Sequence, residues 1–500
     1  MNIPYYLEMY SRKSPHKVFL KTENREYTYS QLNEDANRLA FSLSEQGVNE
    51  NDKVLLLLKN GYEFVVSYFA ILKLGAIVVP TNVKLTAHEV KMIFEDAEAS
   101  AIIAEEERIE DITNLNNCLY VSSGVGNERW LSLPELIASG KNYPYESTFN
   151  EEDVSTILYT SGTTGKPKGV VFQNRNILAV AHMILVEMKM TEHSKTLLMM
   201  PLSHSAPLHL FFVSSLMVGA TAVTREEFHP LELLKAIEQE KITHFFGAPV
   251  AYLFAAKILE QQPFDLSSME WFVYGGSGIG ANEVKYIQKV FNTDRLTCVY
   301  GLTEAGPSGS LLFPEEHEFK VGSVGGRASM FTELKIVNDK GEEVKANEIG
   351  EVVLKGLGMM KEYYNNPEET EKAFINGWLR TGDLARYDED GYIWIVDRVK
   401  DMIISGGVNI YPFEIEKELM KYDLIQDVAV VGVPHPEWGE TVKAFYVSES
   451  PIDETEVKAF LSERLASHKI PRIYEKIDAI PRNATGKILK HVLRKEYEMK

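Results

Sequence analysis

Short apolar segments alternate with amphipathic segments of helical period along much of the chain, and this alternation constrains the fold more than any other feature. Lys53–Leu58 is almost entirely apolar (KVLLLL), Tyr62–Leu74 repeats apolar residues at every third or fourth position, and Ala76–Pro80 (AIVVP) is apolar again. The same order recurs in Glu89–Ala97 and Ala101–Ala104, in Leu231–Gln239 and Thr243–Phe246, and in Ala281–Val290 and Arg295–Tyr300. Continuously apolar strands that are separated by helices predict parallel sheets covered by helices on both sides.

The pattern changes after about residue 320, where apolar and polar residues alternate one by one. Glu333–Val337, Glu351–Lys355 and Tyr392–Val396 show this alternation, and turn-forming residues such as Asp390-Gly391 lie between them. Such alternation favours antiparallel hairpins or a small barrel. The segments past residue 401 mix helix and strand: Pro412–Met420, Val428–Val433, Val442–Val447 and Glu454–Ala466.

We therefore predict an α/β fold: a large N-terminal region of two doubly wound, mainly parallel sheets plus a small β-barrel-like subdomain, followed by a small α+β C-terminal domain. The predicted boundaries place the N-terminal domain at residues 1–398, its β-rich subdomain at about 320–398 and the C-terminal domain at 399–500. The length supports this division, because 500 residues suggest about three compact units at roughly 150 residues each.

Composition and charge exclude several classes of protein. The chain has 52 Lys and Arg against 72 Asp and Glu, a formal charge of −20, whereas non-specific nucleic-acid binding needs a basic surface. Only Cys118 and Cys298 are present, which favours a reducing compartment. The longest apolar stretches, Val65–Pro80 and Leu208–Val223, are shorter than the ~20 residues of a membrane span, and each is predicted as a buried helix followed by a buried strand. We expect a cytoplasmic protein with no nucleic-acid partner and no integral membrane span.

The most informative segment is Thr156–Gly169, TILYTSGTTGKPKG. A buried strand, Ile157–Tyr159, runs into a loop that two lysines follow; the loop residues are Thr160, Ser161, Gly162, Thr163, Thr164 and Gly165, and the lysines are Lys166 and Lys168. Glycines let backbone N–H groups converge on an anion, hydroxyls add donors and lysines add charge, so the segment predicts a polyphosphate site. A solvated linker is the plain alternative, but a linker has no reason to follow a buried strand. A Walker A loop is disfavoured, because Thr160 stands where its first glycine is required and Pro167 follows Lys166.

The segment YTSGTTGKPKG closely resembles the phosphate loop of the adenylate-forming (ANL) superfamily, which includes acyl-CoA synthetases, luciferases and the adenylation domains of peptide synthetases. The resemblance extends from Thr28 to Lys487, with the family's motifs in their usual order. For the loop, it implies that residues 160–168 hold the β- and γ-phosphates of ATP. It also implies that Thr160 and Glu304 bind Mg²⁺.

Two motifs resemble the segments that border the acyl site in this family. Met200–His204 (MPLSH) resembles its Pro-Leu-x-His motif, in which the histidine guides entry of the carboxylate, and His209 is a nearby competitor for that role. Without the other motifs, a core or turn histidine would be the better interpretation of His204. Tyr274–Gly278 (YGGSG) follows the predicted strand Trp271–Tyr274. The resemblance places its Gly275, Gly276 and Ser277 beside adenine and the acyl chain, although Gly-rich turns are common.

The motif Tyr300–Glu304 (YGLTE) ends the next predicted strand. The resemblance assigns Tyr300 to stacking on adenine beside Gly301, Thr303 to the α-phosphate and Glu304 to Mg²⁺. The chemistry agrees, because a hard cation prefers a carboxylate together with substrate phosphates. By itself, Glu304 would be interpreted as a surface glutamate at a helix start.

The remaining motifs lie near and beyond the predicted domain boundary. Asp383 (in WLRTGD) and Arg398 (in DRVKD) resemble the family's two ribose contacts; a turn aspartate and a solvated charge run are the plain alternatives. Lys400 falls at the family's hinge, where Asp and Lys both occur, and a lysine there can also reach the nucleotide phosphates. Gly406-Gly407 resembles the loop that lines the pantetheine tunnel of coenzyme A, and Lys487 (in PRNATGK) resembles the C-terminal catalytic lysine.

Together the motifs imply a two-step reaction. A carboxylic acid attacks the α-phosphorus of ATP to give an acyl adenylate and pyrophosphate, while Lys487 bridges the two reacting groups. The small domain then rotates about Lys400, and the thiol of coenzyme A displaces AMP. The predicted acyl pocket is mainly apolar and comprises His204, Phe245, Phe246, Ala248, Val250, Gly276, Gly301 and Ala305. We therefore expect an acyl-CoA synthetase with Mg²⁺ as cofactor that activates an apolar acid, a medium- or long-chain fatty acid ahead of an aryl acid.

Several alternatives stay open. One is a stand-alone adenylation enzyme that loads an aryl or fatty acid onto a carrier protein in trans, and another is an aryl or 2-succinylbenzoate-type CoA ligase. A luciferase-type oxygenase shares every motif, and a non-catalytic nucleotide-binding regulator is disfavoured because Glu304 and Lys487 are intact. A homodimer is compatible with the sequence, which does not fix the oligomeric state.

Overall fold

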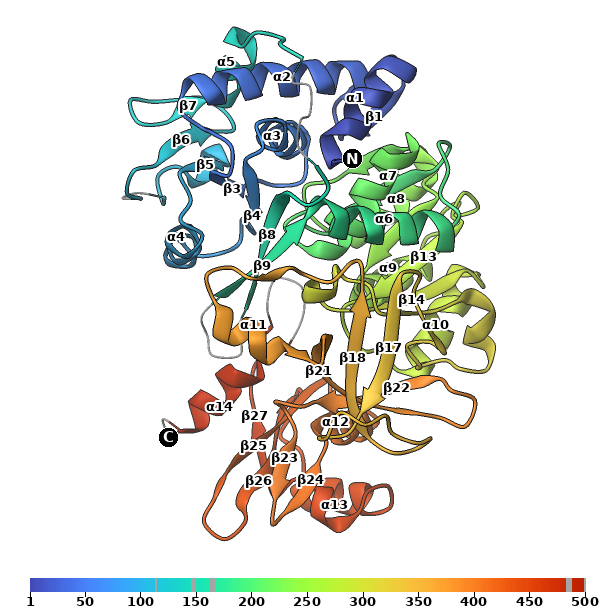
Figure 1. Cartoon of the computed structure of the whole chain (residues 1–500). Coiled ribbons are helices and arrows are strands. Elements are labelled where there is room, and N and C mark those ends of the chain that lie inside the picture. The colour runs from blue at the N-terminus through green and yellow to red at the C-terminus, as the bar shows by residue number, and fades with distance from the viewer. Residues whose placement is uncertain (113–114, 145–149, 162–166, 483–487, 499–500) are drawn as a thin grey trace.

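The computed structural model describes residues 1–112, 115–144, 150–161, 167–482 and 488–498 (Figure 1). Its largest sheet has nine strands in the order β16-β15-β14-β13-β12-β10-β11-β1-β2. These strands are β1 (Val18–Lys21), β2 (Glu26–Thr28), β10 (Lys195–Leu198), β11 (Thr221–Thr224), β12 (His244–Gly247), β13 (Trp271–Gly275), β14 (Leu296–Tyr300), β15 (Ser310–Leu312) and β16 (Arg327–Ala328). The central strands are parallel, and β2, β15 and β16 add antiparallel edges.

A second sheet has eight strands in the order β19-β9-β8-β4-β3-β5-β6-β7. They are β3 (Lys53–Leu57), β4 (Ile77–Pro80), β5 (Ala101–Ala104), β6 (Leu119–Ser122), β7 (Leu131–Ser132), β8 (Val154–Ser161), β9 (Pro167–Gln173) and β19 (Glu362–Tyr363). Six of them, from β3 to β8, pair in parallel, while β8 with β9 and β9 with β19 pair antiparallel. Two mainly parallel sheets were predicted from the apolar alternation, and the prediction is confirmed.

Helices cover both large sheets, as the apolar strands require. They are α1 (Ile3–Lys13), α2 (Tyr29–Glu45), α3 (Tyr62–Lys73), α4 (Ala87–Asp96), α5 (Leu133–Ser139), α6 (Asn174–Glu187), α7 (Val213–Val218), α8 (Pro230–Glu240), α9 (Pro249–Leu259) and α10 (Ala281–Phe291), with the short 3₁₀ turns η1 (Glu106–Arg108), η3 (Thr303–Ala305) and η4 (Pro314–Glu318) and the π-helix η2 (Ala206–Phe212). Capping boxes define two helix starts: Thr28 with Gln31 begins α2, and Thr86 with Glu89 begins α4.

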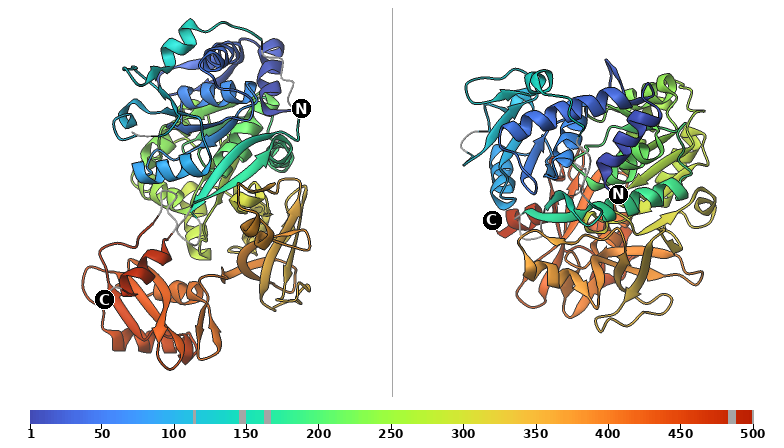
Figure 2. Two further views of the ribbon diagram at one scale, coloured as in Figure 1. Left: turned by 60° about the vertical axis from the view of Figure 1, so that its left-hand side comes forward. Right: turned by 45° about the horizontal axis from the view of Figure 1, so that its top comes forward.

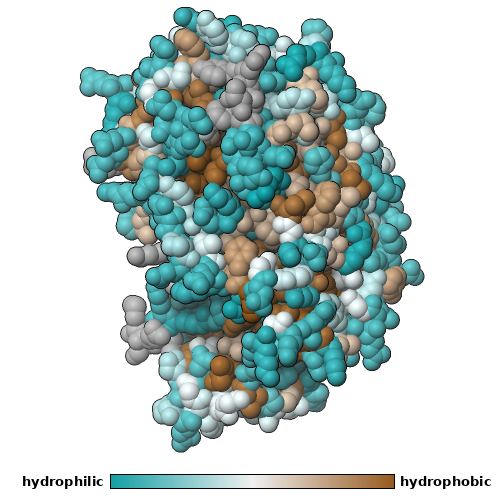
Figure 3. All heavy atoms as spheres, in the orientation of Figure 1, coloured by the Kyte–Doolittle hydropathy of each residue, from teal (hydrophilic) through white to brown (hydrophobic). Residues whose placement is uncertain are grey.

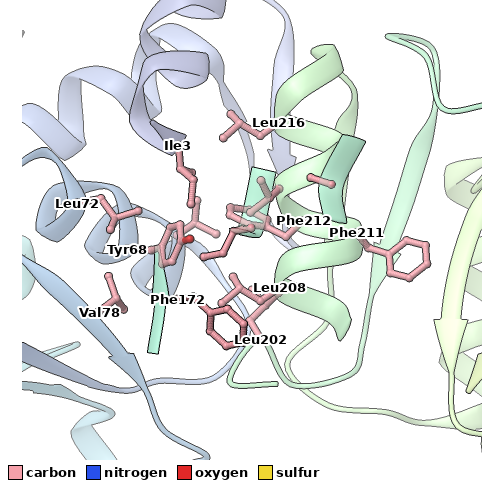
Figure 4. Packing of buried hydrophobic residues seen from close by; sticks show 14 of the residues in the cluster. Ile3, Tyr68, Leu72, Val78, Phe172, Leu202, Leu208, Phe211, Phe212 and Leu216 are labelled. Atoms are coloured by element: carbon pink, nitrogen blue, oxygen red, sulfur yellow. The ribbon is translucent and has the colours of Figure 1, made fainter. Parts of the chain in front are cut away.

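The main core lies between the two large sheets. Tyr68 and Leu72 of α3 meet Phe172 of β9, Phe212 of η2 and Leu216 of α7 there (Figure 4). Both long apolar stretches of the sequence end in this core as predicted, one as α3 followed by β4 and the other as η2 and α7 followed by β11. A buried phenylalanine contributes roughly 2–3 kcal/mol, so this shared layer holds the two sheets together.

Lys73, which interrupts the first apolar stretch, is buried in the same region. Its ammonium lies 2.9 Å from Glu8 Oε1 of α1, and both side chains are largely hidden from solvent. The ion pair explains how a lysine is accommodated within an apolar helix, because a buried charge needs a partner. None of the helices in the described ranges is long and apolar enough to cross a membrane.

An antiparallel sheet follows the two large ones, with strands β17 (Thr332–Val337), β18 (Gly350–Gly356), β20 (Phe374–Ile375), β21 (Trp378–Tyr387) and β22 (Ile393–Arg398), next to helix α11 (Pro367–Ala373). A smaller α+β unit comes last in the chain. It contains β23 (Ile403–Ser405), β24 (Val408–Ile410), α12 (Pro412–Leu419), β25 (Asp427–His435), β26 (Gly439–Val447), α13 (Glu454–Ser462), η5 (Ser467–Lys469), β27 (Ile473–Lys476) and α14 (Lys490–Glu498). The predicted fold class is confirmed, although α13 ends at Ser462, earlier than the predicted Ala466.

Figures 1 and 2 show this last unit set against one end of the large domain. Antiparallel pairing in the preceding sheet ends at Arg398, and the next strand begins at Ile403. Gly278 of the large domain approaches this unit, since a Cβ at that position would lie 3.4 Å from the Phe413 ring. Hydrophilic side chains cover most of the face seen in Figure 3, as suits a chain of net charge −20.

Candidate active site

The segment predicted to hold phosphates connects the two strands of a hairpin. β8 and β9 pair antiparallel, with Thr160 opposite Lys168 and Ser161 opposite Pro167. Thr160 and Ser161 therefore belong to the strand, which corrects the prediction that they lie in the loop: β8 runs two residues further because β9 returns beside it. The predicted loop residues Gly162, Thr163, Thr164 and Gly165 lie outside the described residues.

Lys168 faces a carboxylate and an aromatic ring. Its ammonium forms an ion pair with Glu369 of α11 and lies 5.1 Å from the centre of the Tyr363 ring. The pairing with Lys168 holds the pKa of Glu369 down, at about 2. The ion pair fixes the place of the Lys168 ammonium beside the hairpin.

Glu304 lies across from this lysine, in the short turn η3. Its Oε1 accepts a 2.8 Å hydrogen bond from the Tyr363 hydroxyl, and its backbone oxygen accepts one of 2.8 Å from the Met360 N–H. Thr303 precedes it in the same half-buried turn. The structure thus brings Lys168, Glu304 and Tyr363 together from three separate parts of the sequence.

Magnesium fits this group as a hard cation that takes one protein carboxylate and completes its shell with substrate phosphates and water. Glu304 Oε2 carries no hydrogen bond to any residue that the structure describes, so it can act as such a ligand. In the same described ranges, no group of three or more His, Cys, Asp or Glu residues is arranged to hold a metal by itself. An ion here would therefore depend on the phosphates of a bound nucleotide.

The predicted nucleoside contacts form a second cluster. The Tyr300 hydroxyl donates a 2.8 Å hydrogen bond to Asp383 Oδ2, and Arg398 Nε lies 2.9 Å from Asp383 Oδ1. Asp383 and Arg398 stand opposite each other on β21 and β22, while Tyr300 ends β14 of the largest sheet. Burial, and then the Asp383 carboxylate, raise the pKa of Tyr300, so its hydroxyl remains a donor that fixes the angle of the ring.

Three glycines shape the backbone beside Tyr300. A Cβ on Gly275 would lie 2.4 Å from the Val299 carbonyl oxygen, and one on Gly301 would lie 2.5 Å from that of Pro307, so neither position accepts a side chain without a shift. Gly276 has φ +81° with open space around it, and Ser277 beside it is exposed. The strand end therefore presents bare backbone to the open side, where a flat group can approach.

His204 lies at the end of the loop that follows β10. Its Nε2 is 3.4 Å from the Asn82 amide nitrogen, and burial lowers the pKa of His204 to about 4, so the ring is neutral near pH 7. The competitor His209 is fully buried in η2, where its Nδ1 lies 3.0 Å from the Gly306 oxygen. A run of π-helix such as η2 is often found at functional sites.

The predicted acyl-pocket residues divide between two faces of β12. Phe246 stacks on Phe211 of η2 with ring centres 5.6 Å apart, whereas Phe245 is fully buried against Tyr252 on the other side of the strand. Successive residues of a strand point to opposite faces, so Phe245 does not share the Phe246 surface. Ala305 is buried beside Glu304, and Ala248 is half-buried at the start of α9, where Val250 is 42% exposed.

The residues predicted for domain rotation and coenzyme A lie past β22. Lys400 is exposed in the turn between β22 and β23. Gly406 and Gly407 form the two-residue turn between β23 and β24, with φ +58° and +80°, the geometry for which glycine is preferred in hairpins. Lys487 lies outside the described residues, and α14 just after it is anchored by a 2.9 Å ion pair between Arg494 and Asp401.

Sequence reasoning missed several residues of the site. Tyr363 and Glu369 belong to the EYYNNPEET segment, which was not assigned a role, and Asn82 follows β4. Each is separated from its partner by tens of residues or more. One local signal was available for Asn82: polar residues that follow a buried parallel strand gather at the carboxyl edge of the sheet, where open α/β sheets bind ligands.

Comparison with known proteins places the chain in a family. A family model described as "AMP-binding enzyme" matches residues 7–364, and one described as "AMP-binding enzyme C-terminal domain" matches residues 414–487. A feruloyl-CoA synthase from Amycolatopsis sp is 36% identical over 493 residues, which cover 97% of each chain. The long-chain-fatty-acid–CoA ligase FadD13 of Mycobacterium tuberculosis (strain ATCC 25618 / H37Rv) is 35% identical over 477 residues, 94% of this chain and 93% of that one.

A solved structure agrees with these relatives. The crystal structure of ATP-bound MatB from Rhodopseudomonas palustris superposes with a TM-score of 0.90 at 27% identity, covering 100% of this chain and 99% of that one. The two matched families span most of the chain, and relatives of about this length share more than a third of its residues. The chain therefore belongs to the adenylate-forming (ANL) superfamily of AMP-binding enzymes, as an AMP-forming acid–CoA ligase.

Proposed function

We propose that this ligase activates an apolar monocarboxylic acid, a medium- or long-chain fatty acid first, as its acyl adenylate and transfers the acyl group to coenzyme A. One observation carries the proposal: the half-buried ring of Phe246, stacked on the fully buried Phe211, forms an apolar face beside Gly275. A Cβ on Gly275 would lie 3.4 Å from the Phe246 ring, so the two are in contact. An alkyl chain or an aromatic ring fits such a face, whereas an ammonium or a second carboxylate would lose its hydration there.

The residues around this face support an acid with one charged end. Phe211 and Gly275 at the face carry no charge, nor do Gly276, Gly301 and Ala305 of the predicted acyl pocket, and the predicted pocket residue His204 is neutral near pH 7 because burial lowers its pKa to about 4. A neutral imidazole donates a hydrogen bond to an entering carboxylate without holding it as a counter-ion would. Amino acids and dicarboxylic acids are disfavoured on this ground.

In the first half-reaction, the protein mainly positions charges. Lys168 and the hairpin backbone are proposed to hold the β- and γ-phosphates, Asp383 and Arg398 to hold the ribose, and Tyr300 to stack on adenine. Glu304, with Thr160 as a second ligand, would hold Mg²⁺, which when bound would supply neutralising charge for the leaving pyrophosphate. Lys487 is proposed to bridge the carboxylate and the α-phosphate.

In the second half-reaction, we propose that residues 399–500 rotate about Lys400 relative to residues 1–398. The rotation would withdraw Lys487 and bring the Gly406-Gly407 turn to the entrance for coenzyme A. The exposed position of Lys400 between two sheets and the open space around Gly407 support this role. Lys487→Ala should then abolish adenylation while the variant still converts supplied acyl adenylate to thioester. Equal loss of both half-reactions would contradict the rotation.

An aryl acid is the second candidate, because the feruloyl-CoA synthase is as similar to this chain as the fatty-acid ligase is. Acid-dependent ATP–pyrophosphate exchange separates the two. The panel should contain octanoate, decanoate, palmitate, benzoate, ferulate and 2-succinylbenzoate. The proposal expects the highest kcat/KM with one of the fatty acids; a clear maximum with ferulate or benzoate would establish the aryl alternative, and a maximum with 2-succinylbenzoate would overturn the apolar pocket.

The acyl acceptor needs its own measurement. Coenzyme A and a phosphopantetheinylated carrier protein should be compared as acceptors at equal concentrations, with AMP release as the readout. The proposal expects AMP release with coenzyme A and none with the carrier protein. Release only with the carrier would assign the chain to loading in trans.

A further inference from the structure

Tyr363 occupies a place that none of the motif assignments explains. It lies in β19, which pairs with β9, so that Tyr363 stands opposite Val170. Its N–H donates a 3.0 Å hydrogen bond to the Thr370 hydroxyl, and the next residue, Tyr364, donates its N–H to the Gly169 oxygen at 2.7 Å. The backbone of this tyrosine is thus fixed to the strand that carries Lys168.

The side chain of Tyr363 connects two charged groups of the phosphate end. Its hydroxyl donates to Glu304 Oε1 at 2.8 Å, and its ring faces the Lys168 ammonium at 5.1 Å. The side chain is 9% exposed, so water competes little for either contact. Burial, and then the Glu304 carboxylate, raise the pKa of Tyr363, which keeps the phenol protonated and donating.

The geometry has a consequence for metal binding. A glutamate in a short turn can adopt several side-chain rotamers, and only one of them places its oxygen correctly for a cation. A hydrogen bond to Oε1 selects one rotamer and leaves Oε2 for the metal. Groups that hold a metal ligand in this way contribute strongly to affinity, and their removal weakens binding about 10- to 100-fold.

We propose that Tyr363 is a positioning residue that orients Glu304 for magnesium and thereby sets the magnesium requirement of adenylation. The inference rests on the proposed role of Glu304 as the magnesium ligand. Tyr363 itself touches neither the metal nor the substrate in this assignment. Its effect should therefore appear in the dependence on magnesium and not in the affinity for the acid.

The test is Tyr363→Phe in the full-length chain, which removes the hydroxyl and keeps the ring over Lys168. Initial rates of acid-dependent ATP–pyrophosphate exchange are measured against free Mg²⁺ at fixed ATP. We expect the half-saturating Mg²⁺ concentration to rise about tenfold, the KM for the acid to stay unchanged, and most of the rate to return at high Mg²⁺. A loss of rate that Mg²⁺ does not restore, or no shift at all, overturns the proposal.

Tyr364→Phe is the matched control. Tyr364 is adjacent in sequence and also donates its hydroxyl to a carboxylate, Glu98 Oε2 at 2.9 Å, away from Glu304. The same chemical change there should leave the Mg²⁺ dependence unchanged. An equal shift in both variants would show a general effect of this segment and overturn the specific role of Tyr363.

Glu304→Gln separates failure of this proposal from failure of the proposed function. If Glu304→Gln does not alter the Mg²⁺ dependence, the assignment of Glu304 fails, whatever Tyr363 does. If Glu304→Gln alters the Mg²⁺ dependence and Tyr363→Phe does not, only the role of Tyr363 fails. Adding Tyr363→Phe to Glu304→Gln should produce no further shift, because the hydroxyl then has no carboxylate to orient.

Should Tyr363→Phe not fold, as judged by thermal unfolding, Tyr363→His provides a second variant. It keeps a ring that carries an N–H donor. We expect its half-saturating Mg²⁺ concentration to lie above the wild-type value and its KM for the acid to match wild type. A wild-type Mg²⁺ requirement, or a changed KM for the acid, would overturn the proposal.

Discussion

The two ends of the candidate nucleotide site are built in different ways. At the nucleoside end, Asp383 contacts both Tyr300 and Arg398 directly, and each of the three is itself a proposed ligand of the nucleotide. At the phosphate end, Lys168 and Glu304 are held by Glu369 and Tyr363, which belong to no assigned motif. The nucleoside end is therefore assembled from its own binding groups, whereas the phosphate end depends on supporting residues.

The largest expected effect concerns the phosphate end. Glu304→Gln should lower the rate of acid-dependent ATP–pyrophosphate exchange by about 100- to 1000-fold, because it removes the charge proposed to hold magnesium against the leaving group. Exchange of labelled pyrophosphate at saturating acid measures the effect. Glu98→Gln, which disturbs the tyrosine–carboxylate pair of Tyr364, should change the exchange rate little. A comparable loss of rate in Glu98→Gln would show that the effect is not specific to Glu304.

The next effect concerns the nucleoside end. Asp383→Asn should raise the KM for ATP about 10- to 100-fold, since it weakens charge-assisted hydrogen bonds to the ribose and leaves Arg398 without its partner. Steady-state kinetics at saturating Mg²⁺ measure it. Glu187→Gln breaks an arginine–carboxylate pair elsewhere, with the exposed Arg327, and serves as the control. An unchanged KM with a lower kcat would contradict binding of the ribose by Asp383.

The difference between the two ends also explains which parts of the site the sequence predicts. Tyr300, Asp383 and Arg398 lie in recognisable motifs and Asp383 contacts the other two, so knowledge of the motifs predicts the cluster. Tyr363 was missed because its partner Glu304 is 59 residues away, and long-range contacts bring them together: β19 pairs with β9, and the Met360 N–H donates to the Glu304 backbone oxygen. Contacts between segments that are far apart in the sequence leave no trace in local composition.

In the fold, too, features with a local sequence pattern were predicted and features that depend on long-range contacts were missed. Apolar strands and periodic helices predicted the two large sheets, because burial on both faces leaves a strong local pattern. The hairpin of β8 and β9 was missed, since no strand was predicted after the two lysines that follow the loop. The sequence could have predicted that Phe246 and Phe245 lie on opposite faces of β12, because successive strand residues alternate between faces.

A change of pH should alter the stability of the fold without altering the affinity of the nucleotide site. Burial lowers the pKa of His209 and of His244 to about 4, so the unfolded chain, with a His pKa of about 6.5, binds more protons between these values. The free energy of unfolding should therefore fall as the pH falls from about 6.5 toward 4, by about 2 kcal/mol per histidine at pH 5.

Thermal or chemical unfolding at several pH values measures this loss, and His244→Gln should flatten the profile. Neither cluster of the nucleotide site contains a histidine, so the Kd for adenosine, which has no group that titrates in this range, should stay constant between pH 6 and 8. A Kd that rose in step with the loss of stability would show that the site is not preformed.

The smallest effect is expected in the C-terminal unit. Gly407→Ala should slow the thioester-forming half-reaction by less than about tenfold, because a side chain at φ +80° adds about 1 kcal/mol of backbone strain to the turn. Adenylation should stay unchanged. Gly391→Ala, at φ +84° in another open turn, imposes the same strain; if it slowed the thioester step equally, the turn at Gly407 would have no special role.

The two clusters are proposed to bind opposite ends of one nucleotide. Calorimetric titration with AMP and with ATP plus Mg²⁺ tests it directly in Asp383→Asn and Glu304→Gln. We predict that Asp383→Asn weakens both ligands by the same factor, and that Glu304→Gln weakens only ATP with Mg²⁺ and leaves the Kd for AMP at its wild-type value. Weaker AMP binding in Glu304→Gln, or unchanged AMP binding in Asp383→Asn, would contradict the claim.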